Sequence, residues 1–173
     1  MIFLCPEIWR AARALARLTQ RELSRSSGLS RNAIVSSEMG EPIAFDQVER
    51  LRLFYRSIGV EFLGTADFAT NLVSGAGVRF GPTPAGVALP STDPMSASFA
   101  AARALLGHEL SRVAYESGLS TSVISRIEGD DGYGSRSALV LLQHYRASGI
   151  EFLRAETAAD TRLGVGARHL PRR

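Results

Sequence analysis

The sequence predicts a mainly α-helical fold that is built twice, as two tandem helical bundles, each followed by a short β-hairpin. Three observations support this prediction. A pattern of two capped helices around a glycine turn occupies residues 19–38 and returns at residues 109–128. The same offset of ninety residues relates several other segments of the two halves. Short runs that alternate apolar and charged residues follow the helices, as half-buried strands do.

The first predicted helix begins at Pro6, because proline suits the first helical position, where its missing N–H costs nothing. Apolar residues then recur at helical spacing from Ile8 to Leu18. Trp9 stands near the start of this helix, and we expect it to pack in the core rather than to stack on bases.

Residues 19–28 predict a second helix and its end. Thr19 suits the N-cap, where its hydroxyl accepts a backbone N–H, and Glu22 occupies the reciprocal position of a capping box. Leu23 is the inward residue of the helix. Gly28 falls where the chain needs a positive φ, which glycine adopts without steric cost.

A third helix is expected from Arg31, with Ser30 as its N-cap. Ile34 would lie inward, while Arg31, Asn32 and Ser36 lie on other faces. Two short helices joined by a tight turn form a helix-turn-helix, whose second helix places its N-terminal side chains against base edges in the major groove of DNA. Arginine can bond guanine bidentately, and asparagine can bond adenine in the same way.

Gln20 opens the first helix of this motif, and we expect its amide to point toward a DNA phosphate. The predicted DNA contacts of the first copy are Gln20, Ser30, Arg31, Asn32 and Ser36. The predicted DNA contacts of the second copy are Ser120, Thr121, Ser122 and Arg126.

The second copy has the weaker DNA-facing side. Leu110 replaces Gln20, so the phosphate-facing amide is absent. Asp130 and Asp131 follow its second helix, and carboxylates repel a phosphate backbone. We therefore expect the first copy to be the stronger reader, and any shared operator to have unlike half-sites.

The remainder of each half is expected to contain one more helix and a hairpin. In the first half the helix begins at Asp46, and strands follow at residues 60–63 and 77–80. Glu61 and Arg79 would then pair across the hairpin.

A segment rich in proline and glycine, residues 81–94, is predicted to be an extended linker, because it holds four of the seven prolines. It separates a first domain, residues 1–80, from a second domain, residues 95–173. Ser96 is expected to cap the first helix of the second domain. The constant offset between the two halves indicates a duplicated unit.

Composition and charge exclude some classes of protein and leave others open. The chain of 173 residues is 45% hydrophobic and 21% charged, which is ordinary for a folded protein. Its net charge of +3 is compatible with a polyanionic partner without proving one. Cys5 is the only cysteine, so no internal disulfide is expected, and the cytoplasm is the default compartment. The apolar start of the chain lacks the features of a signal peptide, and no apolar run is long enough for a membrane span.

No catalytic, cofactor or metal site is expected, and the chain is not predicted to be an enzyme. His108, His144 and His169 are scattered, without the spacing of a metal site. His108 matches Leu18 at the edge of the first core, which favours a packed histidine. Residues 75–77 lack the strand–glycine–helix setting of a nucleotide fingerprint.

Both halves resemble the XRE family, the Cro and phage-repressor type of helix-turn-helix regulator. In the first half the residues that carry the resemblance are Arg13-Ala14-Leu15, Thr19-Gln20, Leu23, Gly28-Leu29-Ser30, Ile34 and Glu38. In the second half they are Arg103-Ala104-Leu105, Val113-Ala114, Gly118-Leu119-Ser120 and Val123-Ile124-Ser125-Arg126-Ile127-Glu128. The segment from Gly59 to Leu63, with the later Gly77-Val78-Arg79, is similar to a bacterial subgroup with a hairpin after the last helix.

The resemblance implies two lambda-repressor-like helical bundles, sequence-specific binding to double-stranded DNA, and control of transcription, often repression. Family members typically form dimers, and here the duplication would build the pair into one chain. Ser37 at a core position, Leu110 and the loop with Asp130 and Asp131 depart from the family pattern. Leu110 and the acidic loop predict weaker DNA binding by the second repeat.

The main alternative is a protein-interaction module of the anti-activator or antitoxin type, in which one or both repeats bind a protein partner. Val35 on the second helix, Leu110 and the acidic loop favour this alternative. A second copy of the chain, bound through hairpin edges or helices, is a further partner that the sequence leaves open.

Overall fold

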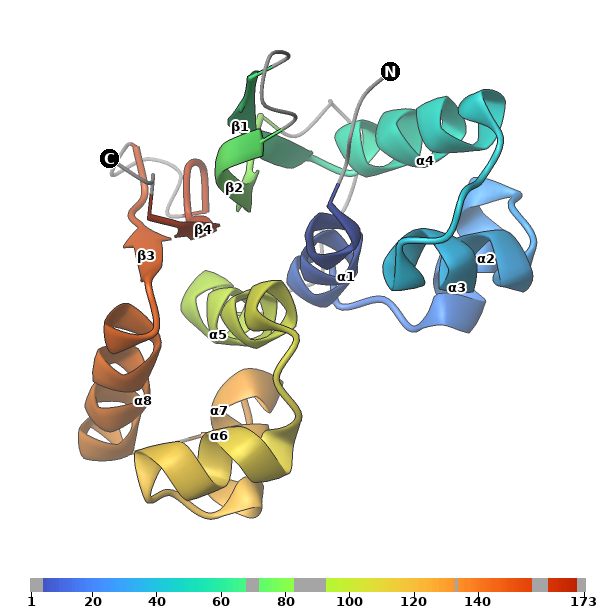
Figure 1. Ribbon diagram of the computed structural model, residues 1–173. Coiled ribbons are helices and arrows are strands. Elements are labelled where there is room, and N and C mark those ends of the chain that lie inside the picture. The colour runs from blue at the N-terminus through green and yellow to red at the C-terminus, as the bar shows by residue number, and fades with distance from the viewer. Residues whose placement is uncertain (1–4, 68–71, 83–92, 133, 157–161, 171–173) are drawn as a thin grey trace.

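The computed structural model describes residues 5–67, 72–82, 93–132, 134–156 and 162–170. These residues form eight helices and one antiparallel sheet of four strands, so the mainly helical prediction is confirmed (Figure 1). Most of the predicted linker, the first four residues and the basic end at 171–173 lie outside the described residues. Within the described part, no helix has both the length and the apolar character of a membrane span.

The two halves contain the same elements in the same order. The first half consists of α1 (Pro6–Leu15), α2 (Gln20–Ser27), α3 (Arg31–Met39), α4 (Phe45–Ser57), β1 (Val60–Asp67) and β2 (Leu72–Phe80). The second half consists of α5 (Pro94–Leu106), α6 (Leu110–Ser117), α7 (Thr121–Gly129), α8 (Ser135–Ala147), β3 (Ile150–Leu153) and β4 (Gly166–His169). Each helix of the first half therefore has a counterpart about ninety residues later.

The local signals for α2 and α3 are confirmed. The Thr19 hydroxyl accepts the backbone N–H of Glu22 at 3.2 Å, and the Glu22 carboxylate accepts the backbone N–H of Thr19 at 2.8 Å. Gly28 ends α2 with a φ of 69°. Ser30 caps α3 and accepts the backbone N–H of Ala33 at 3.2 Å.

Two helix starts differ from the sequence prediction. α5 begins at Pro94, and its N-cap is Asp93, whose carboxylate accepts the backbone N–H groups of Met95 and Ser96. Ser96 is therefore not the cap but a buried residue of the first turn. Asp93 rather than Ser96 is the N-cap because its carboxylate offers two acceptor oxygens and because Pro94 has no N–H that needs a partner. α4 begins at Phe45, one residue before the predicted Asp46.

The four strands lie in the order β1-β2-β4-β3, and all neighbours are antiparallel. A strand pair after each set of helices is confirmed, but the two pairs are not separate hairpins. β2 and β4 bond to each other and join them into one sheet. Arg79 Nε donates to Glu61 Oε2 at 2.8 Å, so the cross-strand pair predicted between them is confirmed.

The register between β2 and β4 is symmetric. The paired residues are Gly77 with Arg168, Val78 with Ala167, and Arg79 with Gly166. In the sequence repeat, residues 77–79 correspond to residues 166–168 in the same order. Gly77 thus pairs with Arg168, the counterpart of Arg79, and Arg79 pairs with Gly166, the counterpart of Gly77. A two-fold axis through the Val78–Ala167 pair produces this pattern.

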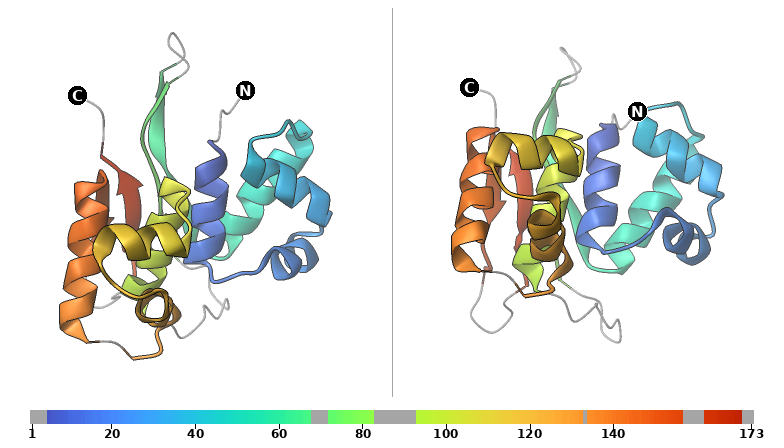
Figure 2. Two further views of the ribbon diagram at one scale, coloured as in Figure 1. Left: turned by 60° about the horizontal axis from the view of Figure 1, so that its bottom comes forward. Right: turned by 90° about the horizontal axis from the view of Figure 1, so that it is seen from below.

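The two halves also meet through α1 and its counterpart α5, which lie side by side between the other helices of their halves (Figures 1 and 2). Ala11 and Ala12 of α1 and their counterparts Ala101 and Ala102 of α5 are all fully buried. Small side chains at these positions allow close approach of the two helices. The described residues of the two predicted domains therefore share one continuous hydrophobic core.

Each half carries the same aromatic cluster beneath the sheet. In the first half Trp9 lies 5.2 Å from Phe62, measured between ring centroids, and is 3% exposed. The prediction that Trp9 packs in the core is confirmed. The counterparts Phe99 and Phe152 lie 5.3 Å apart.

Candidate nucleic-acid interface

The turn between α2 and α3 directs the first turn of α3 outward. Leu29 is buried under the turn and Ile34 is fully buried against the core, so these two apolar side chains fix the orientation of α3. Arg31 and Asn32 are consequently exposed. Among the described residues, neither side chain has a hydrogen bond or ion pair, so both are available to a ligand.

Two other predicted contacts of the first copy are partly engaged within the protein. Gln20 Nε2 donates to Glu38 Oε2 at 2.9 Å, which uses one of the two N–H groups of the amide that was expected to point at a phosphate. The Ser36 hydroxyl donates to Glu41 Oε2 at 2.6 Å. Both side chains are half-buried, in contrast to the exposed Arg31.

Glu38 is the central buried carboxylate of the first helix pair. Arg13 Nε donates to its Oε1 at 2.5 Å and Arg13 Nη2 to its Oε2 at 3.0 Å. Arg10 Nη1 donates to the main-chain oxygen of Glu38. These bonds attach α3, the helix that carries Arg31, to α1 at the centre of the molecule.

The second half has the same ion pair between Arg103 and Glu128, at 2.8 Å from Nε and 2.7 Å from Nη2. The hydrogen bonds to Glu128 raise the pKa of Arg103 above its usual value, so the guanidinium stays charged. Neither ion pair was predicted from the sequence. The available signal was that arginine and glutamate recur together at the repeat offset, in Arg13 with Glu38 and again ninety residues later.

The predicted contacts of the second copy lie at the corresponding end of α7. Ser120 is the N-cap and accepts the backbone N–H of Val123 at 3.3 Å. Thr121 and Ser122 are exposed. Arg126 is exposed too, but its Nη2 donates to the main-chain oxygen of Gly132 at 2.7 Å, which ties it to the loop after α7.

The exposed charge differs in sign between the two helix pairs. Residues 19–40 contain three exposed arginines and one exposed carboxylate, namely Arg21, Arg25 and Arg31 with Glu22. Residues 109–130 contain two exposed arginines and three exposed carboxylates, namely Arg112 and Arg126 with Glu109, Glu116 and Asp130. The first pair therefore attracts a polyanion more strongly than the second.

Arg21 and Arg25 lie on the exposed side of α2 and were not among the predicted DNA contacts. The first helix of a helix-turn-helix crosses the DNA backbone, where arginines neutralise phosphates. Their counterparts are Ser111 and Tyr115, and Tyr115 is 91% exposed. The helical spacing of Arg21 and Arg25, at i and i+4, was the signal that they share a face.

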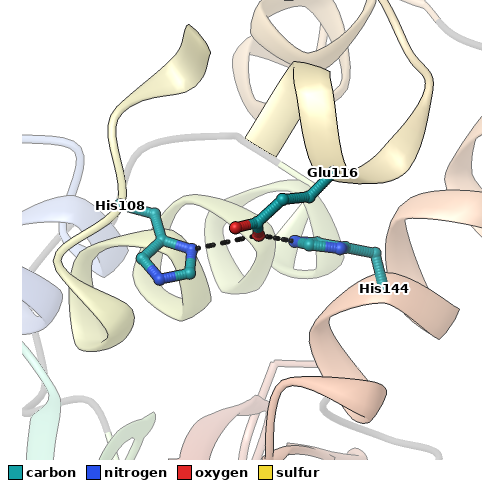
Figure 3. Close-up of side chains that lie close together, drawn as sticks. All are labelled: His108, Glu116 and His144. Carbon is teal, nitrogen blue, oxygen red and sulfur yellow. Dashed lines mark ion pairs between the residues drawn. The ribbon is translucent and has the colours of Figure 1, made fainter. Parts of the chain in front are cut away.

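The second half also contains a histidine pair that the sequence analysis described as scattered. His108, in the turn between α5 and α6, and His144, on α8, both face Glu116 of α6 (Figure 3). His108 Nδ1 lies 3.8 Å and His144 Nε2 lies 3.7 Å from Glu116 Oε2. The description was wrong for these two residues because the helix packing, not their spacing in the sequence, brings them together. His169 lies on β4 and is not part of this group.

Comparisons of the chain with protein-family models, with curated proteins and with solved structures found no match. The most specific features are the outward first turn of α3, the basic surface of α2 and the symmetric joining of the two halves.

Proposed function

We propose that the chain is a sequence-specific, double-stranded DNA-binding transcriptional regulator, acting as a repressor. Two tandem helix-turn-helix units, α2–α3 and α6–α7, contact major-groove half-sites. The observation that carries this proposal is the first turn of α3, where Arg31 and Asn32 are exposed and free of partners within the described part of the chain.

The chemistry of these two side chains suits base edges. Arginine donates two parallel hydrogen bonds to O6 and N7 of guanine, and asparagine bonds N6 and N7 of adenine. Both residues stand at the N-terminal end of α3, the end that enters the major groove in this motif. Arg21 and Arg25 on α2 supply the phosphate contacts that position the helix.

The internal two-fold relation supports a built-in pair of readers. In a symmetric dimer of this type the operator repeats the two-fold symmetry of the protein. The half-sites should therefore be inverted with respect to each other. They should also differ in sequence, because Thr121 and Ser122 replace Arg31 and Asn32.

The test compares variants of α3 on an operator that is selected from random duplex DNA with the full chain. Arg31→Ala and Asn32→Ala should each weaken binding to that operator by about 1–3 kcal/mol, because each removes one bidentate base contact. Binding to scrambled DNA should weaken less for Asn32→Ala than for Arg31→Ala, since only arginine carries charge.

Arg56→Ala is the matched control, because Arg56 is an exposed arginine on α4, away from α3. It should retain the preference for the operator over scrambled DNA. Variants at Arg31 and Asn32 that bind the operator as tightly as the parent chain would refute the assignment.

A protein-interaction module is the second candidate, and one observation favours it. Met39 and Phe45, which lie on either side of the loop between α3 and α4, are 69% and 68% exposed. Exposed apolar side chains mark a protein-binding surface where they form a contiguous patch. A weak response of DNA binding to salt, together with a stable complex with a protein partner, would favour this candidate.

A further inference from the structure

Three side chains of the second half converge on one point between the turn before α6, α6 itself and α8. They are His108, Glu116 and His144, and Figure 3 shows the two imidazoles on opposite sides of the carboxylate. One ligand atom from each residue lies within 4.8 Å of the other two. The group is distinct from the proposed DNA-contacting residues.

The two histidines turn buried nitrogens toward Glu116 without forming hydrogen bonds. The side chain of His108 is 11% exposed and that of His144 is 10% exposed. His108 Nδ1 and His144 Nε2 are buried atoms that lack any hydrogen-bond partner among the described residues. Their distances of 3.8 and 3.7 Å from Glu116 Oε2 exceed hydrogen-bond length. Buried polar atoms normally have hydrogen-bond or metal partners. A group bound between these two nitrogens would supply the missing partner.

The spacing suits a small cation. A tetrahedral zinc ion, with bonds of about 2.1 Å to nitrogen and oxygen, places neighbouring ligand atoms about 3.4 Å apart. The separations of 3.8 and 3.7 Å from Glu116 exceed that value by a few tenths of an ångström, and the two histidine nitrogens lie within 4.8 Å of each other. Metal binding would therefore draw the three side chains closer together.

We propose that His108, Glu116 and His144 bind a divalent transition-metal ion of the zinc class, with solvent as the fourth ligand. Two imidazoles and one carboxylate form a donor set that zinc commonly takes, and three protein ligands leave one position open. The side chain of Glu116 is 32% exposed, so solvent reaches the site from its side.

The surroundings of Glu116 and His108 act on both side chains. Arg112 Nε donates to Glu116 Oε1 at 2.8 Å, which leaves Oε2 directed at the histidines. This hydrogen bond lowers the pKa of Glu116 and keeps the carboxylate ionised. Burial, and then the charge of Arg112, lower the pKa of His108, while the charge of Glu116 opposes this shift.

The first half lacks the corresponding ligands, because the counterparts of the three residues are Leu18, Ser26 and Phe54. The metal would therefore act on the second half alone. It would tie α6 to α8 and so steady the helix pair with the weaker DNA-facing side.

The test is a titration of the tag-free full chain with zinc chloride. Isothermal titration calorimetry measures the binding, and scanning calorimetry measures the Tm. One zinc ion should bind per chain, and zinc at a hundred times its Kd should raise the Tm by about 5–10 °C. His108→Leu and His144→Phe introduce the residues of the first half, and each should weaken zinc binding at least tenfold. His169→Gln, which alters the histidine outside the group, should leave binding unchanged.

Absence of zinc binding by the parent chain would overturn the proposal, and so would undiminished binding by His108→Leu and His144→Phe. Far-UV circular dichroism without zinc shows whether each variant is folded. If a histidine variant does not fold, Glu116→Gln serves in its place, since it preserves size while removing the charge, and it too should weaken binding. No DNA is present in these titrations, so their outcome is independent of the proposed DNA binding.

Discussion

Glu38 joins three helices through one carboxylate. It accepts hydrogen bonds from Arg13 of α1 and Gln20 of α2, while itself belonging to α3. The side chain of Glu38 is 5% exposed, so it depends on these partners for compensation of its charge. Glu128 has the corresponding bonds from Arg103 but lacks a glutamine donor, because Leu110 occupies that position.

Arg13→Met should lower the free energy of unfolding by about 3 kcal/mol, because it leaves the Glu38 carboxylate buried without its counterion. This is the lower end of the range for buried pairs, since the Arg13 side chain is 24% exposed. Urea denaturation measures the loss. Arg52→Met is the control, and its loss should be at most about 1 kcal/mol, because the pair with Glu49 lies near the surface. Equal losses in the two variants would contradict this account of Glu38.

Thr19→Ala should cost about 1 kcal/mol of stability, because it removes the N-cap of α2. Glu109→Ala, at the corresponding position before α6, should cost almost nothing, since Glu109 makes no side-chain cap bond. The N–H and hydroxyl of Thr19 lower the pKa of Glu22, so the capping box is complete at neutral pH. The difference between Thr19→Ala and the parent chain should therefore shrink as the pH falls below 4.5, the ordinary glutamate value. A difference that is constant with pH in urea denaturation would argue against the capping box.

The helices and strands were largely predictable, because their signals are local. The caps at Thr19 and Ser30 and the glycine at position 28 identify the α2–α3 pair within a dozen residues. The joining of β2 to β4 was not predictable, since each hairpin has two edges and nothing local selects the partner. The approach of His108 and His144 to Glu116 was not predictable either, because the packing of helices distant in the sequence brings them together.

Two glycines explain in hindsight why β2 and β4 can pair. A Cβ atom added to Gly77 would lie closer than 3.0 Å to Arg168 and to the main chain of Ala167. A Cβ atom added to Gly166 would lie equally close to the main chain of Val78 and Arg79. The same residue type thus recurs on both sides of the two-fold axis.

Gly77→Ala should lower the free energy of unfolding by about 1–3 kcal/mol, because the added methyl group overpacks the contact with β4. Amide hydrogen exchange should accelerate in β2 and β4 in this variant. Gly134→Ser is the control, since a Cβ atom there meets no other atom and serine suits the N-cap of α8. Unchanged exchange in Gly77→Ala would show that the two strand pairs do not depend on this close approach.

At the scale of the whole molecule, direct packing between the two halves fixes their relative position. α1 and α5 share a core of alanines, and β2 and β4 share a sheet. A pair of DNA readers on such a body has a fixed spacing and a fixed inverted orientation. The two readers should therefore require a defined distance between half-sites, which a loosely tethered pair would not.

The most direct test of DNA reading is a titration of the purified chain against its selected operator, the same operator with one half-site scrambled, and fully scrambled DNA, at two salt concentrations. Binding to the operator should be the tightest and should weaken steeply with salt. The logarithm of the binding constant should fall with the logarithm of the salt concentration, with a slope of about 0.9 for each phosphate neutralised. Scrambling the half-site read by α3 should cost more affinity than scrambling the other. Equally weak binding to all three DNAs would contradict the central claim that this chain reads DNA sequence.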